Sequence, residues 1–99
     1  MATLAFLTHS FWRPAKSDLH AAFDDAVKNS TALSERPDNA TLLKIYALYK
    51  QATEGDNEAK KPSFTEMVGR AKWDAWEKLK GQSLDEAKQG YIDLITSLR

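Results

Sequence analysis

The sequence predicts an all-α protein with four helices in one small domain. Apolar residues recur at three- and four-residue spacing in four separate segments, which is the pattern of helices that bury one face. No segment shows the sustained alternation of apolar and polar residues that a half-buried strand would have. The 99 residues are enough for a single domain with its own core. Together these features favour a four-helix bundle.

The first helix is predicted over residues 19–33, where apolar side chains follow helical spacing. Ser17 or Asp18 can cap its amino end, because a side-chain oxygen there accepts from a free backbone N–H of the first turn. Pro37 and the polar residues before it end the helix. The residues of the predicted buried face are Leu19, Phe23, Ala26, Val27, Ser30 and Leu33.

The second helix is predicted from a cap at Asp38 or Asn39 to about Glu54, with Gly55 as its carboxyl-terminal stop. It carries two neighbouring stripes that together are wider than one core-facing stripe requires. Either this helix is central and buried on two sides, or one stripe faces the core while the other, rich in tyrosine, lines a groove. The first stripe is Ile45, Leu48, Tyr49 and Ala52, and the second is Leu42, Tyr46, Tyr49 and Thr53, with Lys50 at its margin.

The third and fourth helices are each predicted to begin at a capping box, in which a serine and a glutamate three residues later bind each other's backbone N–H groups. Ser63 with Glu66 marks the first box, and Ser83 with Glu86 marks the second. Residues 55–62 before the first box form a polar loop. The apolar face of the fourth helix consists of Leu84, Ala87, Tyr91, Leu94, Ile95 and Leu98.

The third helix, which Gly81 ends, shows the same double character as the second. Trp73 lies well off its core stripe, and Lys72 lies between the two faces. Trp73 is therefore either a partly exposed filler or a ligand contact. The residues of the predicted core stripe are Val68, Ala71, Ala75, Trp76 and Leu79.

The composition excludes several classes of protein. Because there is no cysteine, neither a disulfide scaffold nor a thiolate zinc site is possible. The 14 basic residues balance 14 acidic ones, so no overall field draws the chain to nucleic acid or to an anionic membrane. Residues 60–80, in contrast, hold six basic residues and three acidic ones, an excess of three positive charges. That local excess suits a compact anionic ligand, and we expect a monomer that binds no nucleic acid.

No catalytic motif is present, so we predict that the protein is not an enzyme. The four glycines stand singly, which excludes a Gly-rich phosphate loop. His9 and His20 are the only histidines, and neither lies in a nucleophile motif. His20 and Asp24 are four residues apart, but two exposed ligands do not make a metal site. We therefore expect no catalytic residue, no metal and no cofactor.

Residues 1–17 are predicted to be an irregular extension ahead of a helical domain over residues 18–99. Their apolar run is too short for a signal peptide or a membrane span, so we expect a cytoplasmic protein without stable membrane insertion. The extension carries Phe6, Leu7, Phe11 and Trp12. These side chains are expected to pack on the domain's own surface, with disorder or docking on a neighbouring molecule as the alternatives.

A group of aromatic and lysine residues remains after the core has been assigned. Tyrosine offers a ring for packing and a hydroxyl for phosphate or ribose, while the lysine ammonium group is a compact charge suited to phosphate. Taken alone, Lys72 is better explained as a solvated surface residue, so the indication lies in the group and not in this lysine. The members of the group are Tyr46, Tyr49, Lys50, Lys72, Trp73 and Tyr91.

The order of these residues resembles the acyl-CoA-binding protein family. The pattern Y-x-x-Y-K-Q-A-T-x-G-D begins at Tyr46, and A-K-W-D-A-W begins at Ala71 at the family's separation. Tyr91 falls where the family has its late tyrosine, and residues 19–98 align without an obvious gap. The resemblance implies an up-down-down-up four-helix bundle with a bowl-shaped site for an acyl-CoA ester.

The resemblance also implies roles for particular residues. Trp73 contacts the acyl chain, Leu42 helps to line its groove, and Lys61 matches a loop position that is commonly basic. Thr31 stands where many relatives have a phosphate-contacting lysine, which Lys28 can replace from one helical turn away. The residues implied to hold the adenine, ribose and 3′-phosphate of the coenzyme A head are Tyr46, Tyr49, Lys50, Lys72 and Tyr91.

The function expected from the residues and the resemblance is non-covalent binding, buffering and transport of medium- to long-chain fatty acyl-CoA esters. An acyl-CoA has an anionic, aromatic head and a long apolar tail, which require cations, tyrosines and an apolar groove. The acyl-CoA is then a carried ligand and not a cofactor. The alternative is a small helical protein-protein interaction module that docks a partner through its exposed aromatic residues.

Overall fold

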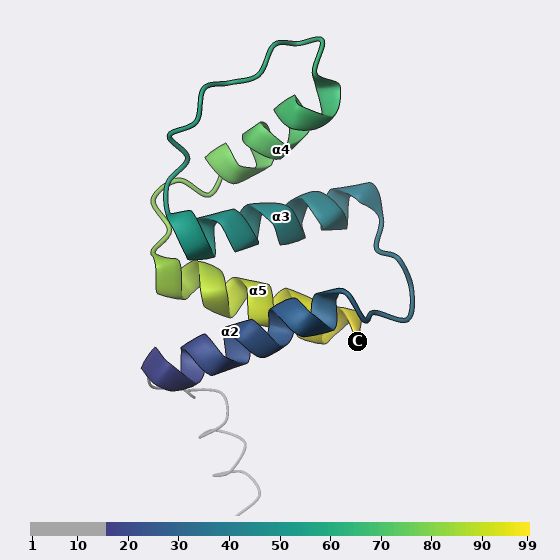
Figure 1. The fold of residues 1–99 in the computed structure, drawn as a ribbon, viewed down its shortest axis with the longest axis vertical. Helices are drawn as coiled ribbons and strands as arrows, with labels where there is room; N and C mark the ends of the chain where they lie inside the picture. The colour runs from purple at the N-terminus through teal and green to yellow at the C-terminus, as the bar shows by residue number, and fades with distance from the viewer. Residues whose placement is uncertain (1–15) are drawn as a thin grey trace, which may run out of the picture.

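The computed structural model describes residues 16–99, and residues 1–15 lie outside that part. Four α-helices account for most of it, namely α2 (Lys16–Ser30), α3 (Asn39–Glu54), α4 (Met67–Glu77) and α5 (Leu84–Leu98), and none of these residues forms a strand. In Figure 1, α2 and α5 run in one direction while α3 and α4 run in the other. The all-α class and the up-down-down-up order are thus confirmed. Phe6, Leu7, Phe11 and Trp12, which were predicted to pack on the domain's own surface, lie outside the described residues.

The helix ends follow the local chemistry of the sequence only in part, and α4 ends at Glu77, four residues before the predicted stop at Gly81. Asp38 caps α3, its Oδ1 accepting from the Thr41 N–H at 2.8 Å, and Gly55 ends this helix with a φ of 84° that favours glycine. Ser17 and Asp18, predicted as caps of the first helix, instead lie within the first turn of α2. That helix ends at Ser30, so Leu33 follows it in the turn.

The two predicted capping boxes have different outcomes. At α5, Ser83 accepts from the Glu86 N–H at 3.0 Å, and the Glu86 carboxylate accepts from the Ser83 N–H at 3.1 Å. At α4 the box prediction is wrong, because the Ser63 hydroxyl bonds to the Thr65 hydroxyl and Glu66 itself occupies the cap position without a side-chain bond. The helix begins only at Met67, since the Glu66 N–H bonds to the Ser63 carbonyl in a turn.

The hydrophobic core lies between α2, α3 and α5. Helix α5 is central and packs against both α2 and α3, while α4 packs against α3. Gly90 allows α3 to approach α5 closely, because a Cβ there would lie 3.2 Å from Leu48 Cδ2. The buried residues of the core are Phe23, Ala26, Ala52, Ala87, Tyr91 and Ile95.

The predicted core stripe of the third helix is only partly confirmed. Trp76 is buried, but Val68 is 70% exposed, so its assignment to the core is wrong. The reason is that α4 contacts only α3 among the helices of residues 16–99, and in Figure 1 it diverges from α3, so that its first turn lies farther from that helix than its last turn does. The structure therefore leaves much of α4 available for something other than core packing.

Candidate functional site

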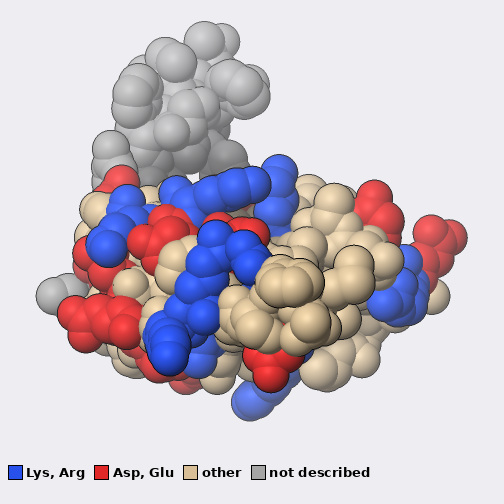
Figure 2. Space-filling model, turned by 90° about the horizontal axis from the view of Figure 1, so that it is seen from above, with Lys and Arg blue, Asp and Glu red and all other residues tan. Residues whose placement is uncertain are grey.

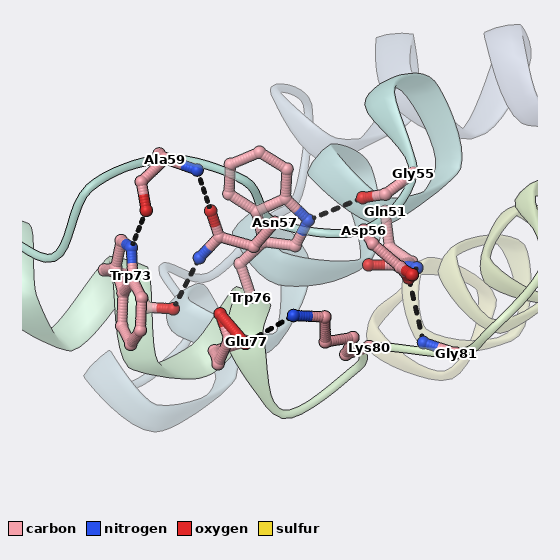
Figure 3. A network of polar contacts seen from close by, with 10 residues as sticks. All are labelled: Gln51, Gly55, Asp56, Asn57, Ala59, Trp73, Trp76, Glu77, Lys80 and Gly81. Carbon is pink, nitrogen blue, oxygen red and sulfur yellow. Dashed lines mark hydrogen bonds and ion pairs between the residues drawn. The ribbon is translucent and has the colours of Figure 1, made fainter.

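Hydrogen bonds between side chains and backbone groups connect α4 to the loop after α3 (Figure 3). Trp76 Nε1 donates to the Gly55 carbonyl at 2.9 Å, and Trp73 Nε1 donates to the Ala59 carbonyl at 2.7 Å. Buried Asn57 completes the attachment, because its Oδ1 accepts from the Ala59 N–H at 2.9 Å and its Nδ2 donates to the Trp73 carbonyl at 3.4 Å. Both tryptophans of α4 therefore position the helix as well as fill space.

A second polar cluster joins the end of α3 to the turn before α5. Gln51 is fully buried, and its Nε2 donates both to Asp56 Oδ1 and to the Gln82 carbonyl at 2.9 Å. Asp56 Oδ1 also accepts from the Gly81 N–H at 2.8 Å. This backbone bond from Gly81, with the bond from Gln51, lowers the pKa of the Asp56 carboxyl group. The cluster fixes where α3, α4 and α5 meet.

Tyr49 and Tyr91 belong to a three-ring aromatic cluster. The Phe23 ring centroid lies 6.1 Å from that of Tyr49 and 5.1 Å from that of Tyr91, and the two tyrosine rings are 6.3 Å apart. Tyr49 is 40% exposed, whereas Tyr91 is buried in the core, and this burial raises the pKa of the Tyr91 hydroxyl. Tyr49 is thus the ring of the cluster that a ligand reaches from solvent, and a ligand contact of Tyr91 stays a prediction.

Tyr46 and Lys72 form the polar bridge between α3 and α4. The Lys72 Nζ lies 5.3 Å from the centroid of the Tyr46 ring, within the range of a cation–π contact. Lys72 is exposed and makes no ion pair with any of residues 16–99. Its ammonium protons are therefore available to an anion that packs over the tyrosine, which is the chemistry predicted for this pair.

Two of the other predicted cations, Lys50 and Lys61, are already engaged within the protein. Lys50 forms an ion pair with Glu54, and its Nζ lies 5.0 Å from the centroid of the Trp76 ring. The hydrogen bond to Glu54 raises the pKa of Lys50, so this lysine keeps its charge. Lys61 Nζ lies 3.7 Å from Asp74 Oδ1 and 5.3 Å from the centroid of the half-buried Trp73 ring.

Two residues assigned from the resemblance lie at the edges of this arrangement. Leu42 is half-buried on α3, one turn before Tyr46. Lys28 is exposed in the last turn of α2, and its carbonyl accepts from the hydroxyl of Thr31 at 2.9 Å. A ligand contact of either residue stays a prediction.

A cavity of about 690 Å³ lies between α3 and α4, with Leu94 of α5 in its wall. Its lining is mainly apolar, and Lys44, Asp74 and Lys78 supply its charges. None of the ligand residues predicted from the sequence lines it. The lining residues are Ala40, Leu43, Lys44, Ala47, Leu48, Ala71, Asp74, Ala75, Lys78, Leu79 and Leu94.

The cavity adjoins the bridge between Tyr46 and Lys72. Leu43 and Tyr46 are three residues apart on α3 and are therefore neighbours on its surface, while Ala71 directly precedes Lys72 on α4. Sequence analysis missed this cavity because it assigned Ala71, Ala75 and Leu79 to the core. The signal was present in the two alanines, since such small side chains leave space unless a partner helix fills it.

The described part of the chain contains neither a membrane-spanning helix nor a cluster of metal-ligating side chains. Between residues 16 and 99, no helix is both long and apolar enough to cross a bilayer. Within the same residues, no three side chains of the metal-ligating types come together.

Comparisons with known proteins agree with the resemblance in the sequence. The family model described as "Acyl CoA binding protein" matches residues 20–95. The chain is 44% identical over 77 residues to acyl-CoA-binding protein homolog 1 of Caenorhabditis elegans, covering 78% of this chain and 90% of that protein. It is 46% identical over 76 residues to acyl-CoA-binding protein of Saccharomyces cerevisiae, covering 77% of this chain and 87% of the relative.

The fold also matches a solved structure. The crystal structure of Oryza sativa acyl-CoA-binding protein 2 superposes with a TM-score of 0.78 at 34% sequence identity, covering 81% of this chain and 89% of the other.

Proposed function

This chain belongs to the acyl-CoA-binding protein family, and we propose that it binds medium- to long-chain fatty acyl-CoA esters non-covalently, buffers them and carries them through the cytoplasm. One observation carries the proposal. A free lysine over a tyrosine ring joins α3 to α4, next to an apolar cavity between the same two helices. An amphipathic ligand with an anionic aromatic head and a long apolar tail needs both features side by side.

In this proposal the coenzyme A head is held by aromatic rings and cations on α3 and α4. Tyr46 and Tyr49 supply ring faces for the adenine, and Lys72 supplies charge for the phosphates. Lys50 contributes only part of its charge, because the Glu54 carboxylate competes for the ammonium group. The resemblance implies these head-group roles for Tyr46, Tyr49, Lys50 and Lys72 without ranking the two lysines, and the proposal adds that Lys72 is the leading cation.

The acyl chain is assigned to the cavity between α3 and α4. Its volume of about 690 Å³ lies within the usual range for small-molecule sites, and its lining is mainly apolar, with Lys44, Asp74 and Lys78 as the charged residues of its wall. Leu43 and Ala71 stand where the thioester end would enter from the side of Tyr46 and Lys72. The ligand emerges unchanged, because the proposed site contains no nucleophile with a base beside it.

Calorimetry with free coenzyme A, octanoyl-CoA and palmitoyl-CoA tests this function. Each buried methylene contributes about 0.8 kcal/mol, so affinity should rise by up to roughly fourfold per methylene, with free coenzyme A by far the weakest ligand. Equal affinity for the octanoyl and palmitoyl esters would contradict an apolar tail site. No response of tryptophan emission to palmitoyl-CoA would favour the interaction module instead, because Trp73 directly follows Lys72 on α4.

A substitution that fills the cavity tests where the tail lies. Ala71→Phe should weaken palmitoyl-CoA much more than free coenzyme A, because the added ring occupies the space assigned to the chain. Ala21→Phe, an equal change at an exposed position of α2, is the matched control. Circular dichroism of both variants confirms the fold, and an equal loss for both ligands in Ala71→Phe would place the tail elsewhere.

A further inference from the structure

Three large apolar side chains project into solvent at the start of α4. Phe64 and Met67 are each 77% exposed, and Val68 is 70% exposed, which makes them the three most exposed large hydrophobic residues of the described chain. They lie within five consecutive residues, at the tip formed by the loop after α3 and the first turn of α4. Single exposed apolar residues are ordinary on a protein surface, but a contiguous group indicates an interaction site.

The tip is held in place by contacts within the loop. The Glu66 N–H bonds to the Ser63 carbonyl at 3.0 Å, and the Arg70 N–H bonds to the Glu66 carbonyl at 2.9 Å. Pro62 packs over Gly69, where a Cβ would lie 3.6 Å from the proline ring. The apolar side chains are therefore presented by an ordered turn and remain exposed despite this packing.

Basic side chains surround this apolar tip. Residues 60–74 contain Lys60, Lys61, Arg70 and Lys72 against Glu66 and Asp74, an excess of two positive charges, and Lys61 is the lysine paired with Asp74. Arg70 follows Met67 by three residues and Lys72 follows Val68 by four, so each cation lies beside an apolar neighbour on the helix surface. Figure 2, which looks down on this side of the molecule, shows a band of Lys and Arg beside an area without charged side chains.

We propose that the tip of residues 60–72 docks reversibly on the surface of a bilayer that contains anionic lipids. Phe64, Met67 and Val68 would enter the headgroup boundary, while Lys60, Arg70 and Lys72 meet the anionic headgroups. A second copy of this chain fits less well, because pairing the same surfaces would bring the same positive charges together. No helix spans the membrane in this arrangement, which is consistent with the described part of the chain.

Docking by this tip would bring the ligand site close to the lipid surface. Ala71 and Lys72 lie in the turn of α4 that follows Met67 and Val68. If the proposed function is correct, the carrier would load and release its ligand at the membrane. The docking itself does not depend on that function, because it is measured on the protein without acyl-CoA.

Sedimentation with vesicles tests the proposal. The full chain without ligand is mixed with vesicles of phosphatidylcholine alone, or of phosphatidylcholine and phosphatidylserine in equal amounts. Binding is expected only to the mixed vesicles and should fall with added salt. The double substitution Phe64→Ser with Met67→Ser should weaken it at least about tenfold, since two apolar side chains no longer enter the interface. Leu84→Ser, at an exposed apolar residue of α5, is the matched control and should leave it unchanged.

Charge reversal separates the two parts of the surface. Lys60→Glu with Arg70→Glu should abolish the preference for phosphatidylserine, while affinity for palmitoyl-CoA in free solution stays near that of the unchanged protein. Absence of sedimentation by the unchanged chain, or equal sedimentation of the Phe64→Ser/Met67→Ser variant, would overturn the proposal. Self-association in analytical ultracentrifugation that this variant abolishes would assign the tip to a second copy instead.

Discussion

At the scale of single residues, Lys72 and Lys50 carry the same charge but differ in what engages it. Lys72 lies over Tyr46 and has no carboxylate partner among the described residues, whereas Lys50 is paired with Glu54. A cation that is free before binding gives its full charge to a phosphate. A cation that must first leave a carboxylate contributes only the difference between its interaction with the phosphate and its interaction with that carboxylate. The two lysines should therefore differ in importance although the sequence presents them as equals.

Substitution of each lysine by methionine measures this difference. Lys72→Met should weaken palmitoyl-CoA binding by about 2 kcal/mol, roughly thirtyfold, and Lys50→Met by less. Neither change should unfold the domain, because neither ammonium group is part of the core. Lys80→Met, at a lysine paired with Glu77 away from the cavity, is the control. Calorimetry at low salt checks the order, and unchanged affinity in Lys72→Met would remove this residue from the site.

The residues of the site were predictable to different degrees. The aromatic and lysine residues stood out because they exceeded what a core-facing stripe needs, and the structure does bring Tyr46 and Lys72 together. The bonds from Gln51 to the Gln82 carbonyl and from Asn57 to the Trp73 carbonyl were not predictable, because these partners are backbone groups far away in the sequence. Whether a polar side chain is buried, and which groups it bonds to, becomes known only from the fold.

At the scale of helices, the two predicted capping boxes show where the local sequence was enough to predict the start of a helix and where it was not. The Ser-x-x-Glu pattern occurs twice, yet only Ser83 and Glu86 form the reciprocal bonds. At residues 63–66 the Glu66 N–H instead bonds to the Ser63 carbonyl in a turn, and the Ser63 hydroxyl bonds to the Thr65 hydroxyl. The Ser-x-x-Glu pattern alone therefore does not decide whether a capping box forms.

Serine-to-alanine substitutions at the two positions test this difference. Ser83→Ala should lower the free energy of unfolding by about 1 kcal/mol, because the first turn of α5 loses a bond to its Glu86 N–H. Ser63→Ala should change it by much less, since the Ser63 side chain bonds only to the exposed Thr65 hydroxyl. Urea denaturation measures both, and equal losses would mean that the Ser63 side chain does support α4.

At the scale of the whole molecule, the helices are not equally secured. Helix α5 is packed on two sides by α2 and α3. Among the described helices, α4 packs only on α3, and the hydrogen bonds of Asn57, Trp73 and Trp76 add to this contact. The number and order of the helices could be predicted from apolar spacing and from the resemblance. The weaker packing of α4 compared with α5 could not be predicted, because it depends on which helices are neighbours in space.

The unequal packing has a consequence for hydrogen exchange. In the free protein, amides of α4 should exchange faster than those of α5, because α4 can open without disrupting the core between α2, α3 and α5. A ligand held between Tyr46 on α3 and Lys72 on α4 is lost whenever α4 opens, so its binding free energy adds to the cost of that opening. Saturation with palmitoyl-CoA should therefore slow the exchange of the α4 amides more than that of the α2 amides. Mass spectrometry of exchanged peptides measures both. Slowing confined to α2, or equal in all four helices, would mean that the ligand does not bridge α3 and α4.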